Sequence, residues 1–400
     1  MRSTLLAATA LAAVGSIPFA ALAQDKAGPI RIGLGGEFYG AFSLASQSTG
    51  VGPDGIAGTA DDAPGQNRRN NGFLRVAKIY FQGQTDLDNG LRVGVLIKLN
   101  AEDCLDQIDT AFIWFDGGYG RFEYGATSGA GDAMFIGAPD PVSHMGLNSP
   151  DLFVVNWANP AGTGNLAAVP VTKVDTSTLE RLNYFTPRIL GIQLGLSYAP
   201  VECVAGNTGT LPCGGTYNGM PADNLPRGYD LLQGAATWLG AIGPVKLGLY
   251  GSYMRARTGD GVVPVSGVPG TGANRQWGVG GQIAYAGFSL GGGYRRSIDD
   301  AIFFRYTPDL NASDWNLGLT YTEGNWHGGV QYAGKRTTLA GREDSFDGAS
   351  VGASYLIGPG IDLFAAVQYY DWRTDSPLPA TRSAATNEAW SASLGTSIDF

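Results

Sequence analysis

The chain has 400 residues, of which only 15% are charged, and it combines 61 glycines with a formal net charge of −9. An acidic chain is poorly suited to nucleic acid, because phosphate binding needs a basic surface. Its three cysteines and two histidines fit no zinc-binding spacing, so the composition also argues against a zinc centre.

The N-terminal residues are typical of an export signal. Met1-Arg2 supplies a positive start, an apolar run follows over residues 5–14, and Ala21-Leu22-Ala23 is a small-x-small cleavage motif. The apolar run is shorter than the ~20 residues that a membrane-spanning helix needs, which disfavours an anchor. We therefore expect a cleaved signal peptide over residues 1–23 and one folded unit over residues 24–400.

Alternation with a period of two dominates the rest of the chain. From residue 390 onward, apolar residues or threonine occupy the even positions and Ser, Gly or Asp the odd ones. The segments 192–198 and 315–321 show the same pattern. Because successive side chains of a strand point to opposite faces, each segment has one apolar face and one small or polar face. Almost no helical periodicity is present, so the sequence predicts an all-β chain.

The polar face of these strands distinguishes between two all-β architectures. In a soluble sandwich that face would carry many charges, whereas here it carries Gly, Ser, Gln and Asn, which suit the wall of a wide aqueous lumen. A closed barrel is also the only β structure that satisfies every backbone group in lipid. We therefore predict a transmembrane antiparallel β-barrel.

Turn signals divide the chain into sixteen expected strands. Short turns rich in Gly, Asn and Pro, such as those at 88–90, 243–244 and 358–360, are typical of hairpins. They alternate with longer polar segments. Outer-membrane barrels have the same arrangement, with short turns at one end of the barrel and long loops at the other. The expected strands are 30–46, 73–86, 91–101, 107–116, 119–127, 178–188, 192–200, 228–240, 245–258, 275–285, 288–298, 313–322, 326–337, 345–357, 361–373 and 387–400.

Four segments carry a family resemblance. The last strand, which ends in Ile398-Asp399-Phe400, resembles the C-terminal signature of Gram-negative outer-membrane proteins. FQGQTDLDNGLRVGV (Phe81–Val95) resembles the hairpin of the second and third strands of general bacterial porins. YGRFEYGATSGAGD (Tyr119–Asp132) resembles their fifth strand where it enters the third loop, and RLNYFTPRILGIQLGLSYAP (Arg181–Pro200) resembles their sixth and seventh strands.

The resemblance implies a homotrimer of sixteen-stranded barrels in the bacterial outer membrane, reached by Sec-type export and surrounded by lipid and lipopolysaccharide. It also implies that a long third loop, here roughly Ser128–Ser177, folds into the lumen and narrows it. In that family, acidic groups on this loop face basic groups on the wall. The acidic candidates of this loop are Asp132, Asp140 and Asp151.

The alternation pattern indicates which charged residues could line the wall that faces the third loop. Where the neighbouring apolar side chains face outward, the charged ones face inward, and a lipid-facing Arg or Lys would cost ~2–4 kcal/mol at mid-membrane. A position at the rim is the alternative for each of them, because alternation fixes the face of a side chain and not its depth. The wall candidates are Lys78, Arg92, Lys98, Arg121, Glu123 and Arg181.

Two further sites are suggested by loop composition. Asp54, Asp61 and Asp62 lie in a Gly-rich segment and offer oxygen ligands to Ca²⁺, although the spacing is not that of an EF-hand and such residues are common in solvated turns. Cys203 and Cys213 lie close enough in sequence to form a disulfide in an oxidising compartment, which leaves Cys104 over. Calcium is the only cofactor that the sequence suggests.

Two motifs that resemble enzyme signatures lie in the wrong context. Gly50–Gly55 matches G-x-G-x-x-G, but it contains a proline and no helix follows it. Gly348–Gly352 matches G-x-S-x-G within an expected strand and not at a strand-to-helix turn. We therefore expect no enzyme but a diffusion channel for ions and small hydrophilic solutes. The alternatives are a substrate-selective channel and, from another class, an adhesin or barrel enzyme.

Overall fold

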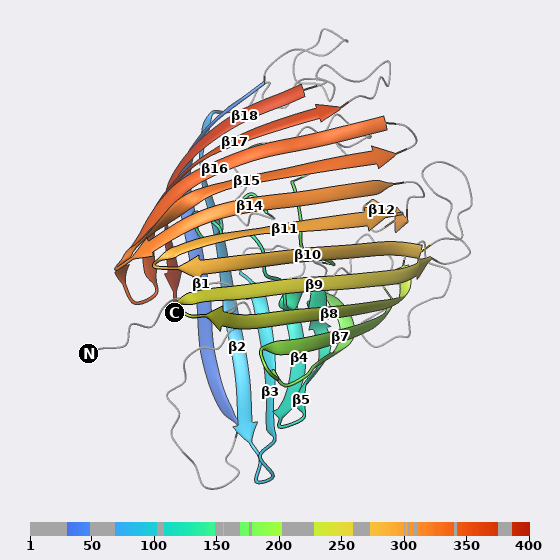
Figure 1. The fold of residues 1–400 in the computed structure, drawn as a ribbon. Coiled ribbons are helices and arrows are strands. Elements are labelled where there is room, and N and C mark those ends of the chain that lie inside the picture. The colour runs from blue at the N-terminus through green and yellow to red at the C-terminus, as the bar shows by residue number, and fades with distance from the viewer. Residues whose placement is uncertain are drawn as a thin grey trace.

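A single closed barrel accounts for nearly all of the described chain (Figure 1). Within the described residues, sixteen strands form an antiparallel barrel, and two short strands pair in a separate hairpin. The computed structural model describes residues 30–48, 69–101, 108–148, 155, 169–175, 178–201, 228–258, 273–299, 301–302, 305–306, 310–339, 342–374 and 386–400.

The sixteen expected strands are confirmed, with ends displaced by at most three residues. The barrel strands are β1 (Arg31–Gln47), β2 (Asn71–Asp86), β3 (Arg92–Asn100), β4 (Ile108–Gly117), β5 (Gly120–Thr127), β6 (Leu179–Phe185), β7 (Ile192–Val201), β8 (Gly228–Ile242), β9 (Val245–Thr258), β10 (Ala273–Tyr285), β11 (Phe288–Ile298), β14 (Asn311–Glu323), β15 (Trp326–Leu339), β16 (Arg342–Gly358), β17 (Ile361–Thr374) and β18 (Thr386–Asp399). The hairpin of β12 (Ala301–Ile302) and β13 (Arg305–Tyr306) falls in an expected loop. β6 ends three residues early, before Pro187, because proline cannot donate a ladder hydrogen bond.

The two ends of the chain close the barrel. β1 pairs antiparallel with β18. The amide of Gly36 donates to the carbonyl oxygen of Phe400 over 2.9 Å, and the amide of Phe400 donates back to Gly36 over 3.0 Å. A side chain on Gly36 would collide with the Phe400 ring, so the terminal residue is seated directly over a glycine.

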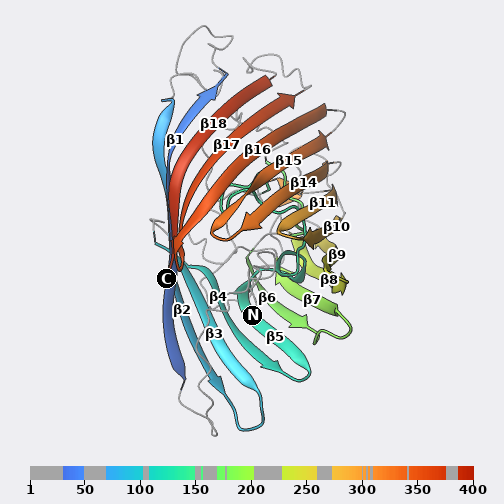
Figure 2. The same cartoon turned by 60° about the vertical axis from the view of Figure 1, so that its left-hand side comes forward.

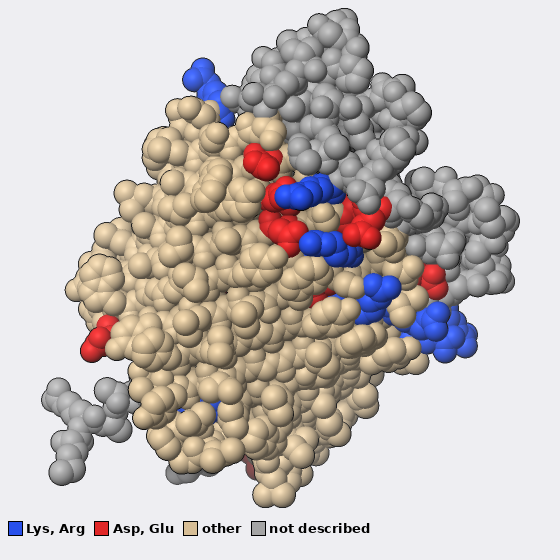
Figure 3. Space-filling view, turned by 45° about the horizontal axis from the view of Figure 1, so that its top comes forward, with Lys and Arg blue, Asp and Glu red and all other residues tan. Residues whose placement is uncertain are grey.

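The two faces of the sheet differ as alternation predicts. On β14, Leu317 and Leu319 are exposed on the outside, whereas Asn316 and Thr320 are buried on the inside. The face shown in Figure 3 correspondingly carries few charged side chains outside one cluster. Among the residues that the structure describes, no helix combines the length and the apolarity needed to cross a membrane.

The two rims of the barrel are unequal. One rim, here called the turn end, carries tight turns such as that between β10 and β11, where Gly287 adopts a φ of +85° that favours glycine. At the other rim, the loop end, the connections after β1, β7 and β9 lie outside the described residues. Wall height also varies, since β3–β7 have 7–10 residues and the other barrel strands have 11–17.

Candidate functional site

The described parts of the connection between β5 and β6, residues 128–148, 155 and 169–175, lie inside the barrel (Figure 2) and are called the inner loop. It begins with a single turn, α1 (Ala130–Ala133), which contacts β6, β7, β8 and β9. The amide of Ala130 donates to Ser197 Oγ over 2.8 Å. Tyr250 Oη donates to the carbonyl oxygen of Gly131 over 2.6 Å. These bonds hold the start of the loop against the wall.

The next segment, residues 134–142, lies on a row of inward-facing glycines. A Cβ built on Gly291 would lie 2.6 Å from the carbonyl oxygen of Gly137, and one built on Gly280 would lie closer still to that of Ile136. Because real Cβ atoms do not approach a backbone oxygen so closely, only glycine leaves room for the loop here. This row, the glycine track, consists of Gly195, Gly248, Gly280, Gly291, Gly318 and Gly352, on β7, β9, β10, β11, β14 and β16.

The tip of the inner loop reaches β1. His144 stacks on Tyr39 of β1, with ring centroids 3.7 Å apart and planes at 9°. Just before the tip, β15 holds Asp140, because Gln331 Nε2 donates to its Oδ1 over 2.8 Å and His327 Nε2 donates to its carbonyl oxygen over 3.1 Å. The middle of the loop is therefore fixed to strands near both ends of the chain.

The loop returns to β6 through residues 169–175 along the same wall. The amide of Val171 donates to Asp314 Oδ1 over 3.0 Å. Gln233 Nε2 donates to the carbonyl oxygen of Val174 over 3.0 Å. Polar wall side chains thus satisfy backbone groups that a loop buried away from water would otherwise leave unpaired.

Buried ion pairs lie between the loop and the wall. Arg181 Nη1 is 2.9 Å from Asp175 Oδ2, and the two side chains are only 0% and 2% exposed. Asp314 lies 2.8 Å from Arg295 and 3.5 Å from Lys335, and all three are buried. Since these charges are removed from water, each depends strongly on its partner.

Arg181 is the expected wall residue whose position differs most from the prediction. Its side chain faces inward, as alternation indicates, but the inner loop covers it completely. It therefore ties the loop to β6 and does not line an open passage. The second cluster was missed by the sequence reasoning, since the adjacent Arg295 and Arg296 obscure which of the two faces the lumen.

The open part of the lumen lies beside β2 and β3. Apart from glycines, the inward side chains of these strands, including Lys78 and Lys98, are all partly or fully exposed. Most of those of β8 and β14 are buried, several of them against the inner loop. The inward side of β2 and β3, with Arg121 at the start of β5, is called the open wall.

The cations of the open wall differ in how far they are neutralised. Lys78 Nζ lies 3.1 Å from Glu37 Oε1. Lys98 Nζ lies 5.1 Å above the ring of Tyr80, a cation–π contact. Within the described ranges, Lys98 has no carboxylate at ion-pair distance, so it leaves a net positive charge on the wall.

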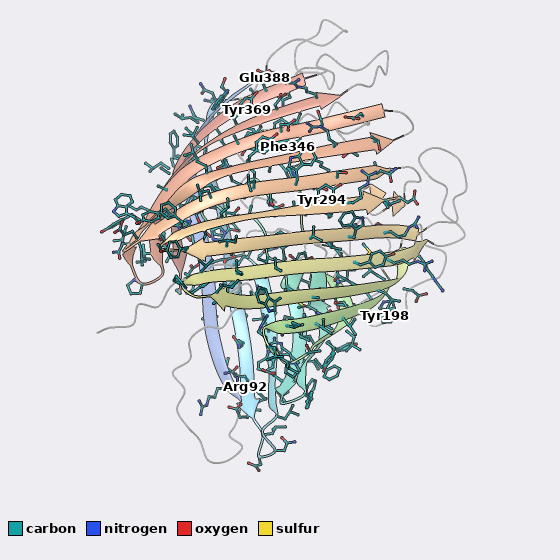
Figure 4. All side chains as sticks on the ribbon, in the orientation of Figure 1. Arg92, Tyr198, Tyr294, Phe346, Tyr369 and Glu388 are labelled. Carbon is teal, nitrogen blue, oxygen red and sulfur yellow. The ribbon has the colours of Figure 1, made fainter. Side chains whose placement is uncertain are left out.

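Two further predicted wall residues lie nearer the turn end. Arg121 Nε donates to Glu123 Oε1 over 2.7 Å, and its guanidinium carbon lies 4.6 Å from the centre of the Trp114 ring. Arg92 lies at the tip of the β2–β3 hairpin (Figure 4) and pairs with Asp86 at 2.8 Å, both side chains being largely exposed. Arg92 therefore belongs to the mouth of the barrel and not to its middle.

The inner loop contributes two predicted acids. Asp132 lies 2.8 Å from Lys173, on the returning part of the loop. Asp140 is exposed but held by β15 as described above. The remaining candidates, Asp54, Asp61, Asp62, Asp151, Cys104, Cys203 and Cys213, lie outside the described residues. In the part of the chain that is described, no group of three or more His, Cys, Asp or Glu could hold a metal ion.

Comparison with known proteins adds a family and a fold. The family model described as Gram-negative porin matches residues 7–375. The anion-selective porin from Comamonas acidovorans has 11% identity and a TM-score of 0.58, over 93% of this chain and 100% of that one. The outer membrane channel DcaP of Acinetobacter baumannii has 12% identity and a TM-score of 0.56, over 93% and 97%. OmpT of Vibrio cholerae, solved in its trimer form, has 12% identity and a TM-score of 0.55, over 93% and 99%. A search of curated proteins found no match.

Proposed function

This chain belongs to the Gram-negative porin family and is an outer-membrane channel for passive diffusion of small solutes, and we propose that these solutes pass between the inner loop and the open wall. The observation that carries this proposal is the contrast between the exposed inward side chains of β2–β3 and the buried ones of β8 and β14. The proposed constriction consists of Lys78, Lys98, Arg121 and Glu123 on the wall and Asp132 and Asp140 on the inner loop.

Selection in such a passage is electrostatic. Charged side chains around a narrow aqueous gap set ion preference, and no covalent step or energy source is involved. Lys78 and Arg121 are neutralised by neighbouring carboxylates, whereas Lys98 is not. The open wall therefore favours anions at Lys98, despite the net charge of −9 of the whole chain, while the exposed Asp140 of the inner loop favours cations. A substrate-selective channel would differ in showing saturable current block by one solute.

Replacing Lys98 with glutamine tests the selectivity. A unit charge ~4 Å from a passing ion is worth about 1 kcal/mol in water. The substitution should therefore lower the anion-to-cation permeability ratio about fivefold, measured as the reversal potential in a salt gradient. Arg373→Gln, which removes an outward-facing arginine near the loop end, is the matched control and should leave the reversal potential unchanged. Equal reversal potentials for Lys98→Gln and the unmodified protein would remove Lys98 from the passage.

The side of the barrel with the shortest strands supports a homotrimer in which β3–β6 face the neighbouring subunits. The seven residues of β6 extend ~23 Å at ~3.3 Å each, which is a height of ~16 Å at a tilt of ~45°. This is less than the ~25 Å apolar band of the membrane, whereas the 17 residues of β16 exceed it. A wall that is lower than the apolar band is stable if a neighbouring subunit covers it instead of lipid.

The homotrimer predicts a characteristic electrical record. A single reconstituted particle should close in three equal current steps under high voltage, because each subunit carries its own passage. Closure in one step, together with a particle of monomer mass in detergent, would rule out the trimer.

A further inference from the structure

The inward face of β3 carries an apolar side chain next to a cation. Leu96 and Lys98 are consecutive inward residues of this strand, so their Cα atoms lie ~7 Å apart on the same face. Both side chains are partly exposed. On the other side of Leu96, the next inward residue toward the turn end is Gly94, which has no side chain of its own. The space above Gly94 is therefore open to side chains of the neighbouring strands.

Trp114 and Arg121 fill the space above Gly94. Trp114 lies opposite Gly94 across the β3–β4 ladder, and a Cβ built on Gly94 would collide with the Trp114 ring. The guanidinium carbon of Arg121 lies 4.6 Å from the centre of the same ring. Trp114 is only 4% exposed and the Arg121 side chain 24%, so the guanidinium is the part of this stack that meets the lumen. Leu96 is thus flanked by Arg121 on one side and Lys98 on the other.

The two cations beside Leu96 offer a solute different contacts. Arg121 Nε lies 2.7 Å from Glu123 Oε1, so its charge is compensated, whereas Lys98 has no carboxylate of the described residues at ion-pair distance. An anionic group is therefore drawn to Lys98. A guanidinium also stacks on planar rings, and one face of Arg121 already lies on Trp114. The other face of Arg121 and the side chain of Leu96 together suit a flat apolar body.

The inner loop adds apolar surface on the opposite side of the passage. Its residues 133–139 include no charged side chain. Phe135, Ala138 and Pro139 are partly exposed, although this segment rests on the glycine track. The first carboxylate after them is that of Asp140, which β15 holds. Apolar surface on both sides of an aqueous gap favours a solute that can cover it, because water is released from both.

We propose that the open wall binds aromatic monocarboxylates, such as benzoate, as they pass. The carboxylate meets Lys98, and the ring lies on Leu96 against the guanidinium of Arg121. This inference rests on the proposed passage between the inner loop and the open wall, and it names the class of solute that the passage favours. Binding is weak, because a channel conducts only if a solute that enters the site also leaves it.

The test compares the permeability of benzoate with that of acetate, which carries the same charge but no ring. Purified protein is inserted into a planar bilayer between sodium benzoate and sodium acetate, and the reversal potential gives the permeability ratio of the two anions. Benzoate should be the more permeant ion, although it is the larger one. Leu96→Gln replaces the apolar side chain with a polar one of similar size and should lower the benzoate-to-acetate ratio at least about threefold.

Gln82→Leu makes the opposite change on the same wall. Gln82 is partly exposed and lies directly opposite Leu96 on the β2–β3 ladder. A leucine there extends the apolar surface, so the benzoate-to-acetate ratio should rise about threefold. Gln282→Leu is the matched control, because Gln282 faces inward on β10, on the wall that supports the inner loop. Its ratio should equal that of the unmodified protein.

Each outcome decides the proposal. Equal benzoate-to-acetate ratios in Leu96→Gln, Gln82→Leu and the unmodified protein would overturn it, as would a rise in Gln282→Leu as large as that in Gln82→Leu. If Leu96→Gln does not fold, Gln82→Leu alone decides. Lys98→Gln separates this failure from that of the passage: equal ratios with a lowered anion-to-cation ratio in Lys98→Gln would leave the passage in place, whereas no effect of any substitution would remove both.

Discussion

Replacing Gly280 with alanine should lower the single-channel conductance. The added methyl group would overlap the carbonyl oxygen of Ile136, a backbone atom that can move only with the inner loop. Because the loop is held on the wall side by β10, displacement pushes it toward the open wall and narrows the passage. Overpacking of this kind costs about 1–3 kcal/mol, so folding in detergent should also become less favourable.

Gly251→Ala provides the control for this prediction. Gly251 lies on β9, faces outward, and an added Cβ would meet nothing within 4 Å. Conductance in planar bilayers should match the unmodified protein for Gly251→Ala and fall for Gly280→Ala. If both variants conduct alike, the glycine track does not position the loop.

Replacing Arg181 with methionine should release the returning part of the inner loop. The substitution removes the cation that lies 2.9 Å from the buried carboxylate of Asp175, and breaking a buried pair on one side costs about 3–5 kcal/mol. We expect this loss to appear locally, as larger fluctuations of the open-channel current and faster proteolytic cleavage within the loop, because a local segment opens before the barrel does.

A double substitution separates charge from packing. Asp175 adopts a φ of +52°, which asparagine also tolerates, so Arg181→Met/Asp175→Asn removes both charges and keeps the backbone. Replacing a buried pair on both sides is often nearly neutral, so the double variant should recover quiet current and protease resistance. A double variant as noisy as Arg181→Met would assign the effect to lost packing instead of the broken ion pair.

The strands were predictable because lipid imposes a strict physical pattern. Positions that face lipid must be apolar, and positions that face the lumen need not be. Segments such as 315–321 therefore alternate throughout, and the sequence shows which of their side chains face outward. The tight turns indicated where the strands end. Even the early end of β6 has a cause in the sequence, which is Pro187. Closure follows from the need to satisfy every backbone group in lipid, and it pairs the last strand with the first.

The site was predictable only in part, because alternation says nothing about what covers an inward side chain. Lys98 and Arg181 both face inward, yet Lys98 is partly exposed and Arg181 lies beneath the inner loop. The glycine track was invisible for a related reason: Gly280 and Gly318 look like ordinary small lumenal residues until the loop is seen to rest on them. Loop paths depend on many weak contacts that no local pattern encodes.

Thiol labelling of the open wall tests the path of solutes most directly. Lys98→Cys is introduced into a variant whose three native cysteines are serines, and the conductance is recorded while an anionic methanethiosulfonate reagent is added. A thiol at this position lies in the proposed passage, so the current should fall stepwise as it is modified. Leu319→Cys, which faces lipid, should give no change. An unaltered current after complete modification of Lys98→Cys would contradict a passage between the inner loop and the open wall.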